Sequence, residues 1–426
     1  MVERTAYLDR MRLLKDEPRV KMIAGIRHGG KSFMLRRFIA ELKLSGVDDG
    51  HIIHVNFENA APGEPRTARQ IESFIGEKTE GDGKYYIFFD EIQAVAGWEK
   101  TVNALLARHN FSVYVAVSDA AALLKNSART GGQKKYAFIN FKPFSFAEYK
   151  QVFAPAVERG GGLLSKAVAV RNLNGSVFKR FFRYGGFPDV CARLSGDEDA
   201  DAETASERLK NIYASILLSD AIRRAKIRDV ELLEHIANII FTNAGKENST
   251  RKITESLRKR RYAKNLSLVR RYIKTLENSF LIKKVSCCNL LTGKLAQANA
   301  KYFTGDHGLI VAGQNGATRE GIAKNILLND LERREFAVYS GKIKNKIIDF
   351  FAKRGNRFVF LQTVADCNDE TLEQKIDALR LLDNIERFSS EKRYVVFLDE
   401  DMPRKHEAAC GASYFSLRDF LLLEDI

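Results

Sequence analysis

Gly25-Ile26-Arg27-His28-Gly29-Gly30-Lys31-Ser32 is the stretch that decides how this chain folds, because it has the pattern G-x-x-x-x-G-K-S. It follows the apolar run Val20–Ala24 and leads into a helical pattern. Glycines let successive N–H groups point into one concavity, and the helix N-terminus adds partial positive charge. The stretch therefore predicts a phosphate-binding loop for ATP, rather than an ordinary glycine-rich turn. Its candidate nucleotide-binding residues are Gly25, Arg27, Gly29, Gly30, Lys31 and Ser32.

A second apolar run, Tyr85–Phe89, ends in the acidic pair Asp90-Glu91. A run without polar alternation is typical of a strand that is covered on both faces. We expect Asp90 to hold Mg²⁺ together with Ser32, and Glu91 to act as the base that orients the attacking water. Alone, such a pair often marks only a solvated strand end, but beside the phosphate loop it favours an ATPase.

Composition is that of a large intracellular protein. The 426 residues include 69 Lys and Arg against 54 Asp and Glu, and the net charge of +15 favours polyanionic partners. The five cysteines show no C-x-x-C spacing, so neither a zinc site nor a disulfide framework is expected. No segment has the profile of a membrane span or a signal peptide, and we expect no membrane contact and a cytoplasmic location.

Residues 1–150 read as an α/β domain with a parallel sheet. The expected strands cover residues 20–25, 51–57, 85–90, 112–117 and 136–142. Nucleotidases with an added strand beside the phosphate-loop strand carry a polar sensing residue at its tip, and Asp119 has that place here. Residues 59–84 read as a helix bounded by loops.

Many segments in order resemble a family of AAA-type (P-loop) ATP-binding proteins of bacteria and archaea with a C-terminal nuclease-like domain of unknown function. The segments that carry the resemblance are Gly25-Ile26-Arg27, Gly30-Lys31-Ser32, Asn56-Phe57-Glu58, Asp90-Glu91-Ile92-Gln93, Gly97-Trp98-Glu99, Pro143 to Tyr149, Tyr184 to Pro188, Asp229 to Leu233, Tyr272 to Ile282, Gly341-Lys342 and Ile348-Asp349-Phe350. The resemblance implies a P-loop AAA-type domain (1–150), a helical lid or linker (151–245), a winged helix (246–300) and a degenerate α/β nuclease-like domain of restriction type (301–426).

The chain departs from this family at two positions of the ATPase site. The family usually has a sensing Asn where this chain has Asp119, and a Gly-Arg pair where it has Lys134-Lys135. An anion near the γ-phosphate repels it, and lysine lacks the planar forked donor set of arginine. We therefore group Asp119 and Lys135 with Glu91 as candidate catalytic residues, and we expect nucleotide binding with slow hydrolysis.

Two motifs of the middle region have open alternatives. Tyr184-Gly185-Gly186-Phe187-Pro188 is either the turn by which a lid contacts the nucleotide, with Pro188 beside it, or a loop that merely ends a helix. Residues 267–277 form a one-face helical stripe with Ser267 as the expected cap. The segment from Arg251 to Lys274 contains ten Lys and Arg residues and a single acid, Glu255. This winged helix therefore either binds DNA or contacts protein.

The last region lacks most residues of a nuclease site. Asp349 stands where a metal-binding Asp belongs, but the other expected positions hold Lys324, Gln362 and Val364. Hydrolysis needs clustered carboxylates around a divalent ion, so we expect no nuclease activity. Three functions remain: a slow, switch-like Mg²⁺-ATPase, a nucleotide-binding scaffold for DNA or protein that scarcely hydrolyses, and an ATP-gated nuclease. An unknown protein partner and a homo-oligomer are further expectations.

Overall fold

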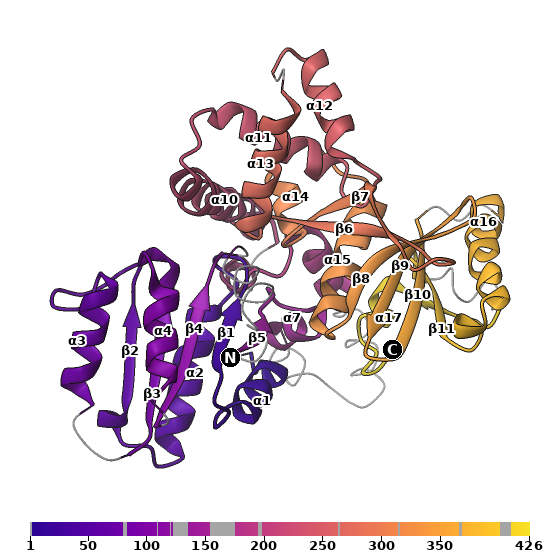
Figure 1. The fold of residues 1–426 in the computed structure, drawn as a ribbon. Helices are drawn as coiled ribbons and strands as arrows, with labels where there is room; N and C mark the ends of the chain where they lie inside the picture. Colours follow the sequence, from indigo (N-terminus) through magenta and orange to yellow (C-terminus); the bar gives the residue numbers. More distant parts are fainter. Residues whose placement is uncertain are drawn as a thin grey trace. The chain divides into compact units, whose positions relative to one another are not determined.

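The computed structural model describes residues 2–79, 83–108, 110–119, 121, 135–153, 175–194, 198–262, 265–313, 316–365, 369–400 and 410–426. These form two compact units (Figure 1). One contains Glu3–Pro143 and Asn278–Phe280, and the other contains Phe144–Glu277 and Leu281–Ile426 with the first residues of the chain. Lys134 and Cys367 lie outside the described residues.

The N-terminal unit contains a parallel five-stranded sheet in the order β2-β3-β4-β1-β5. Its strands are β1 (Val20–Ala24), β2 (Ile52–Asn56), β3 (Tyr85–Asp90), β4 (Phe111–Val117) and β5 (Tyr136–Asn140). The α/β fold and the parallel sheet expected from the sequence are confirmed, with strand bounds that differ by at most two residues. Strands β1, β3 and β4 are buried along their whole length, as their mainly apolar sequences predict. Inside these strands, the polar exceptions are Lys21 of β1 and Ser112 of β4, and Lys21 Nζ donates to Ser112 Oγ at 2.9 Å.

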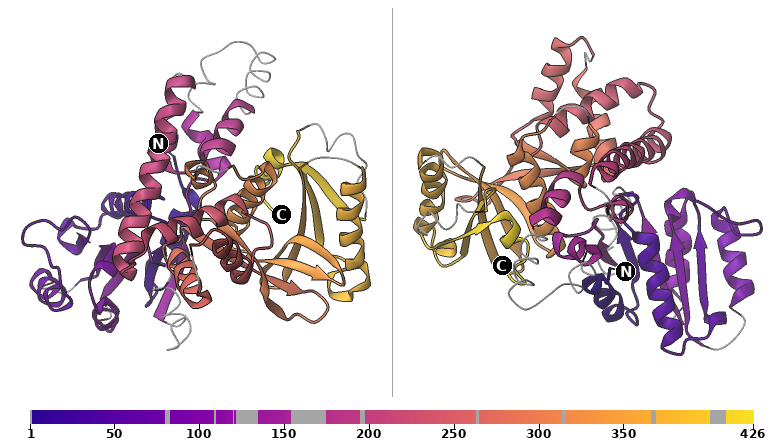
Figure 2. Two further views of the ribbon diagram at one scale, coloured as in Figure 1. Left: turned by 90° about the horizontal axis from the view of Figure 1, so that it is seen from above. Right: turned by 180° about the vertical axis from the view of Figure 1, so that it is seen from behind.

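Helices cover both faces of this sheet (Figures 1 and 2). They are α1 (Thr5–Leu13), α2 (Lys31–Leu44), α3 (Ala68–Lys78) and α4 (Trp98–Leu106). Met11 of α1 and Phe38 of α2 belong to the core on one face, and Ile75 of α3 and Trp98 of α4 to the core on the other. Each such large side chain contributes roughly 1.5–3 kcal/mol on full burial, so the layers hold the loops at the sheet edge in place.

The strand order brings three loops to one edge of the sheet. β4 lies directly between β1 and β3 and is parallel to both. The carboxyl ends of parallel strands meet at the same edge, and ligands of open α/β sheets bind there. The phosphate loop after Ala24, the pair Asp90-Glu91 and the segment after Val117 therefore meet at this edge.

The second unit contains a mixed seven-stranded sheet in the order β12-β11-β10-β9-β8-β6-β7. Its strands are β6 (Ile282–Asn289), β7 (Leu295–Thr304), β8 (Ala337–Ile343), β9 (Lys346–Arg354), β10 (Arg357–Val364), β11 (Lys392–Phe397) and β12 (Ala412–Ser416). β6 pairs with β8, so strands on either side of residue 300 share one sheet.

The helices of the second unit are α7 (Phe146–Phe153), α9 (Pro188–Arg193), α10 (Glu198–Ile216), α11 (Val230–Thr242), α12 (Thr250–Lys259), α13 (Leu266–Asn278), α14 (Gly308–Ala312), α15 (Arg319–Arg333), α16 (Asp369–Arg380) and α17 (Leu417–Phe420). Residues 175–184 are also helical. Among the described helices, none combines the length and the apolarity that a membrane crossing needs. The prediction that Ser267 caps α13 is wrong in detail. The cap is Asn265, whose Oδ1 accepts a hydrogen bond from the Ser267 backbone N–H at 2.8 Å.

Candidate nucleotide-binding site

The loop between β1 and α2 has backbone geometry that glycine makes possible. Gly30, before the first residue of α2, has a φ of 99°, which side chains disfavour. A Cβ on Gly25 would lie 1.9 Å from the carbonyl oxygen of Phe141, so a side chain there cannot fit without backbone movement. Arg4 donates to the carbonyl of Gly29 at 3.3 Å and to that of Lys142 at 2.6 Å, which ties the loop to the segment after β5.

We expect Gly25→Ala to lower the free energy of unfolding by about 2–3 kcal/mol, because the new methyl group overpacks against backbone that cannot rotate away. Gly76→Ala is the matched control: Gly76 lies inside α3, and a methyl group added to it would meet no described atom within 4 Å. Alanine favours a helix interior by up to about 1 kcal/mol over glycine, so the control should be neutral or stabilised. Equal urea midpoints for the two variants would contradict the loop geometry.

Lys31 is the centre of a buried polar cluster and is 3% exposed. Its Nζ donates to Ser118 Oγ at 2.8 Å and to the carbonyl oxygens of Gly25 at 3.0 Å and Ile26 at 3.1 Å. Glu91 Oε1 lies 3.5 Å from the same nitrogen. These contacts aim the ammonium group along the loop, where it can bind the outer phosphates of a nucleotide.

Glu91 lies opposite Lys31 and follows β3 with a positive φ of 54°. Ser118 donates to its Oε1 at 2.7 Å, and Gln93 donates to its Oε2. Burial raises the pKa of Glu91, but Lys31, the Ser118 hydrogen bond and Arg27 outweigh it and lower the pKa below its ordinary value. Glu91 is therefore ionised at neutral pH and can accept a proton.

Asp90 lies beside Glu91 and is fully buried. Burial raises its pKa, and Glu91 adds to this, while the Ser32 hydroxyl and Lys31 act against it. Asn56 donates to Asp90 Oδ2 at 3.3 Å, whereas Oδ1 has no hydrogen-bond partner among the described residues. A buried carboxylate oxygen without a partner, next to a serine hydroxyl, is a donor set that suits Mg²⁺ held jointly with phosphates.

The structure brings together some predicted site residues and not others. Asp119 follows Ser118 at the same edge and is half-buried, and its Oδ1 accepts from the backbone N–H of Ala121 at 2.8 Å. Lys135 is not brought to this edge, because it precedes β5, whose start pairs with the start of β1. At about 3.3 Å per residue, the loop after Ala24 lies roughly 13 Å or more away along the strands.

Pro188 belongs to the second unit, where it begins α9. Gly185 before it has a φ of 79°, and a Cβ there would lie 1.9 Å from Asp306 Oδ1. Asp306 accepts from the N–H groups of Gly186 at 3.0 Å and Gly308 at 2.8 Å. This turn is therefore built around a carboxylate of its own unit.

Sequence reasoning missed Ser118 and Asn56 as site residues. Ser118 bridges Lys31 and Glu91, and Asn56 contacts Asp90. A signal was present for both, because each stands at the end of an expected strand. Their partners could be known only once the strand order was known.

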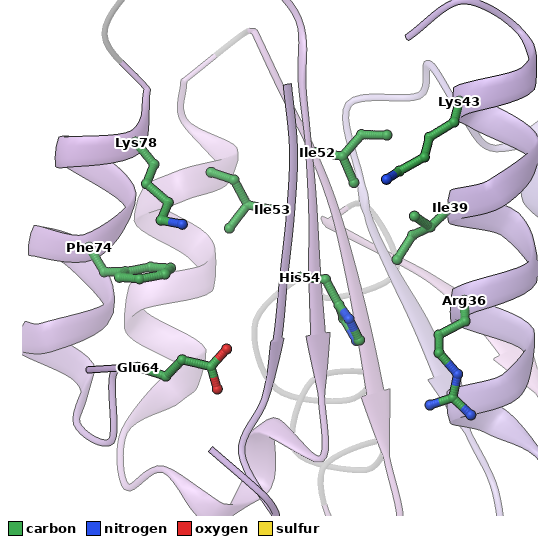
Figure 3. Close-up of a pocket in the computed structure, with 9 residues that line it drawn as sticks. All are labelled: Arg36, Ile39, Lys43, Ile52, Ile53, His54, Glu64, Phe74 and Lys78. Atoms are coloured by element: carbon green, nitrogen blue, oxygen red, sulfur yellow. The ribbon is translucent and has the colours of Figure 1, made fainter. Parts of the chain in front are cut away.

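A separate pocket of about 380 Å³ lies along β2, the edge strand of this sheet. Figure 3 shows Ile52 and His54 on the side of α2, and Ile53 on the side of Phe74, as the alternation of a strand requires. Its lining residues are Arg36, Ile39, Lys43, Ile52, Ile53, His54, Glu64, Phe74 and Lys78. None of these belongs to the loop 25–32, so the pocket is not part of the candidate site.

Comparisons with known proteins agree with this fold. Residues 17–150 match an AAA domain family, and residues 176–319 match a domain of unknown function, DUF8612. The chain is 29% identical over 397 residues to an uncharacterized protein of Haemophilus influenzae, covering 92% of this chain and 94% of that protein. It is 25% identical over 369 residues to the uncharacterized protein MJ1544 of Methanocaldococcus jannaschii, covering 84% and 78%.

Among solved structures, a Walker-type ATPase of Pyrococcus abyssi has a similar fold, with a TM-score of 0.51 at 14% identity. The similarity covers 74% of this chain and 96% of that one. Together with the strand order and the loop between β1 and α2, the match of residues 17–150 identifies the N-terminal unit as a P-loop domain of the AAA type.

Proposed function

We propose that this protein is a Mg²⁺-dependent ATPase that turns over slowly and acts as a switch. The observation that carries the proposal is the buried cluster in which Ser118 bridges Lys31 and Glu91 at the edge where the phosphate loop lies. A phosphate loop, a cation for the outer phosphates and an ionised carboxylate for water are the parts that phosphoryl transfer to water requires. The proposal therefore assigns the activity of ATP hydrolysis to the P-loop domain.

Each residue of the cluster has a role in this proposal. Lys31 Nζ binds the β- and γ-phosphates and gives up part of its contact with Glu91. Glu91 then orients a water molecule and accepts its proton at Oε1 or Oε2. Ser118 keeps the Glu91 carboxylate in position through the 2.7 Å hydrogen bond to Oε1.

The same proposal assigns Mg²⁺ to Ser32 Oγ and the free oxygen Oδ1 of Asp90. When bound there, the ion would neutralise charge that develops on the transferring phosphoryl group. Slow turnover is expected for two reasons: Asp119 puts a carboxylate next to Ser118, and the phosphate-binding Lys31 also contacts the base, Glu91. The anion repels the γ-phosphate, and the pairing must loosen before each turnover.

We further propose that residues 246–300, together with the preceding helix α11 and the end of β7, form a winged helix that binds DNA. Three helices, α11 to α13, precede the β6–β7 hairpin, and Glu247 bridges to Lys301 of that hairpin. Ile253 and Leu257 of α12 face inward. The described cations of this helix and the residues after it are exposed, namely Arg251, Lys252, Arg258, Lys259, Arg260 and Arg261, and Lys264 lies outside the described residues. The only intervening acid, Glu255, pairs with Arg251 at 3.2 Å, so the surface keeps a large positive excess.

Replacing the exposed cations Arg258, Arg260, Arg261 and Arg270 by Gln should weaken duplex DNA binding and flatten its dependence on salt. Each lost phosphate contact should reduce the slope of log K against log salt by roughly one unit. Fluorescence anisotropy of a labelled duplex over a salt series measures this slope.

The control replaces four exposed cations of the N-terminal unit, Arg66, Arg69, Lys100 and Arg108, by Gln. The total charge change is the same, so any general field effect is matched. ATP binding should be unchanged in both proteins. If both variants, or neither, flattened the slope, the winged helix would be better described as a protein-contact module.

The C-terminal strands do not offer a nuclease site, in our proposal. Asp349 is surrounded by lysines, and no group of three or more His, Cys, Asp or Glu side chains in the described part of the chain is placed to hold a metal ion. A divalent ion therefore lacks the clustered carboxylates that cleavage requires. DNA should remain uncut with Mg²⁺ or Mn²⁺.

The second candidate is a nucleotide-binding scaffold with little hydrolysis, favoured by the carboxylate of Asp119 beside Ser118. Phosphate release separates the two: the ATPase releases phosphate from ATP only with Mg²⁺, whereas the scaffold does not exceed the rate in buffer. We also propose a cytoplasmic location, a protein partner and a homo-oligomer.

A further inference from the structure

The second unit buries a carboxylate among three lysines. Asp349 of β9 is 3% exposed. Its Oδ1 lies 2.8 Å from Lys324 Nζ and 3.6 Å from Lys301 Nζ, and its Oδ2 accepts from Lys375 Nζ at 2.7 Å. The lysines come from three elements, β7, α15 and α16. Figures 1 and 2 show α15 and α16 on opposite sides of the sheet, so their lysines reach the carboxylate from both sides.

The cluster occupies the point at which two strands separate. The antiparallel pairing of β9 with β10 ends at Leu361 and Phe350. Beyond it, side chains replace the backbone ladder: Gln362 Oε1 accepts from the Asp349 N–H at 3.2 Å, and Asp349 Oδ2 accepts from the Thr363 N–H at 3.1 Å. The Thr363 hydroxyl donates to the same Oδ2 at 2.9 Å. This fork opens the sheet and fixes the carboxylate, so the lysines are directed to one defined point.

Positive charge is in excess at this point. Three ammonium groups face Asp349 and Glu320, whose Oε1 lies 2.6 Å from Lys324 Nζ. Lys301 has a side chain that is 9% exposed, and its one ion-pair partner within the described part of the chain is Asp349, at 3.6 Å. An ammonium group has three donors, and burying one with a single distant acceptor is costly.

We propose that this lysine cluster is a binding site for an oxyanion of the phosphate class, held by the ammonium groups of Lys301, Lys324 and Lys375. A phosphate group offers several acceptor oxygens and the negative charge that the cluster lacks, and hydrogen bonds between charged partners are strong. Lys375 is the most exposed of the three, with 22% of its side chain accessible, so we expect an anion to reach the cluster on this side. The site binds without metal and does not depend on ATP hydrolysis.

Two ligands could supply such a phosphate group: free inorganic phosphate and the terminal phosphate of a nucleic-acid strand. The test uses the full chain with Lys31→Ala, which removes the other phosphate-binding lysine. Thermal unfolding is measured in sodium phosphate and in sodium chloride of equal ionic strength. Binding to the folded state raises the midpoint as phosphate increases, so we expect a rise of a few degrees at about a hundred times the dissociation constant. An equal midpoint in both salts would overturn the proposal.

Two variants in the same background give opposite results if the site binds an anion. Lys375→Met should abolish the response to phosphate. Asp349→Asn should strengthen the response about tenfold or more in affinity, because the competing carboxylate is gone and the ammonium groups are left without their counter-charge. The control is Lys346→Met, on β9 but paired with Asp377 at 3.7 Å, which should respond like the parent.

A purely structural ion cluster behaves differently: both Lys375→Met and Asp349→Asn lose stability and neither changes its response to phosphate. A Lys375→Met protein that responds like the parent would refute the site, even if Asp349→Asn failed to fold. A 5′-phosphorylated oligonucleotide is then compared with its 5′-hydroxyl form. Stabilisation by the phosphorylated form alone assigns the site to strand ends, and stabilisation by inorganic phosphate alone assigns it to the free anion.

Discussion

Lys31→Ala should reduce the affinity for Mg²⁺-ATP by about a hundredfold or more, corresponding to roughly 3 kcal/mol. Lys31 is the buried cation of the loop, and its Nζ is held by Ser118 and two loop carbonyls. Alanine removes the charge that faces the outer phosphates, while the loop backbone remains. Titration with a fluorescent ATP analogue measures the loss.

The control for this variant is Lys43→Ala in the last turn of the same helix. Lys43 is about half exposed and pairs with Asp49 at 2.9 Å, far along α2 from the loop. Its loss changes the net charge equally and should leave ATP affinity unaltered. Comparable unfolding midpoints show that both proteins are folded. If Lys31→Ala bound the analogue as tightly as the parent, the loop could not be the phosphate site.

Glu91→Gln should retain ATP and lose turnover by about a hundredfold or more. The amide keeps the shape of the carboxylate but cannot accept a proton from water. Because the pKa of Glu91 is lowered, the parent keeps its base ionised at neutral pH and loses it only as the pH falls through that lowered value. Phosphate release at saturating ATP gives the rate, and the analogue titration shows that binding remains.

The control for Glu91→Gln removes one carboxylate far from the candidate site. Glu77 is exposed on α3, and Glu77→Gln should turn over like the parent. Equal rates for Glu91→Gln and Glu77→Gln would mean that Glu91 only ends a strand. A Glu91→Gln protein that also lost ATP would show that its pairing with Lys31 shapes the loop, and the role as base would remain unsupported.

The sheet and the loop could be predicted because local patterns specify them. The apolar runs before Gly25 and Asp90 lack alternation, which is typical of strands that helices cover on both faces. The loop is predicted by its glycines and by its place between a strand and a helix. These features depend only on residues that are close together in the chain, so they can be read from a single sequence.

The bridging role of Ser118 could not be predicted in the same way. It depends on β4 lying between β1 and β3, a pairing between segments almost a hundred residues apart in the chain. The resemblance matches Lys135 to an arginine position, but the parallel pairing of β5 with β1 puts this lysine at the start of β5, away from the site. Pairing register is a long-range property, so position in the sequence alone misplaces such residues.

The lysines around Asp349 could not be predicted from the sequence for a related reason. Its position in an apolar run predicts a buried acid on a strand, but not the lysines that reach it from other elements. From the sequence, Lys324 shows only that a carboxylate is absent at its position. Its positive charge matters because α15 brings it within 2.8 Å of Asp349, at the fork of β9 and β10.

A single-turnover measurement tests the central claim most directly. Parent protein in excess over ATP labelled at the γ-phosphate is followed with Mg²⁺ and with a chelator, so that slow product release does not mask the chemical step. The account predicts phosphate release in one exponential phase that needs Mg²⁺ and is lost in Glu91→Gln. Bound ATP that stays intact in the parent for as long as it does in buffer would contradict the ATPase and leave the nucleotide-binding scaffold.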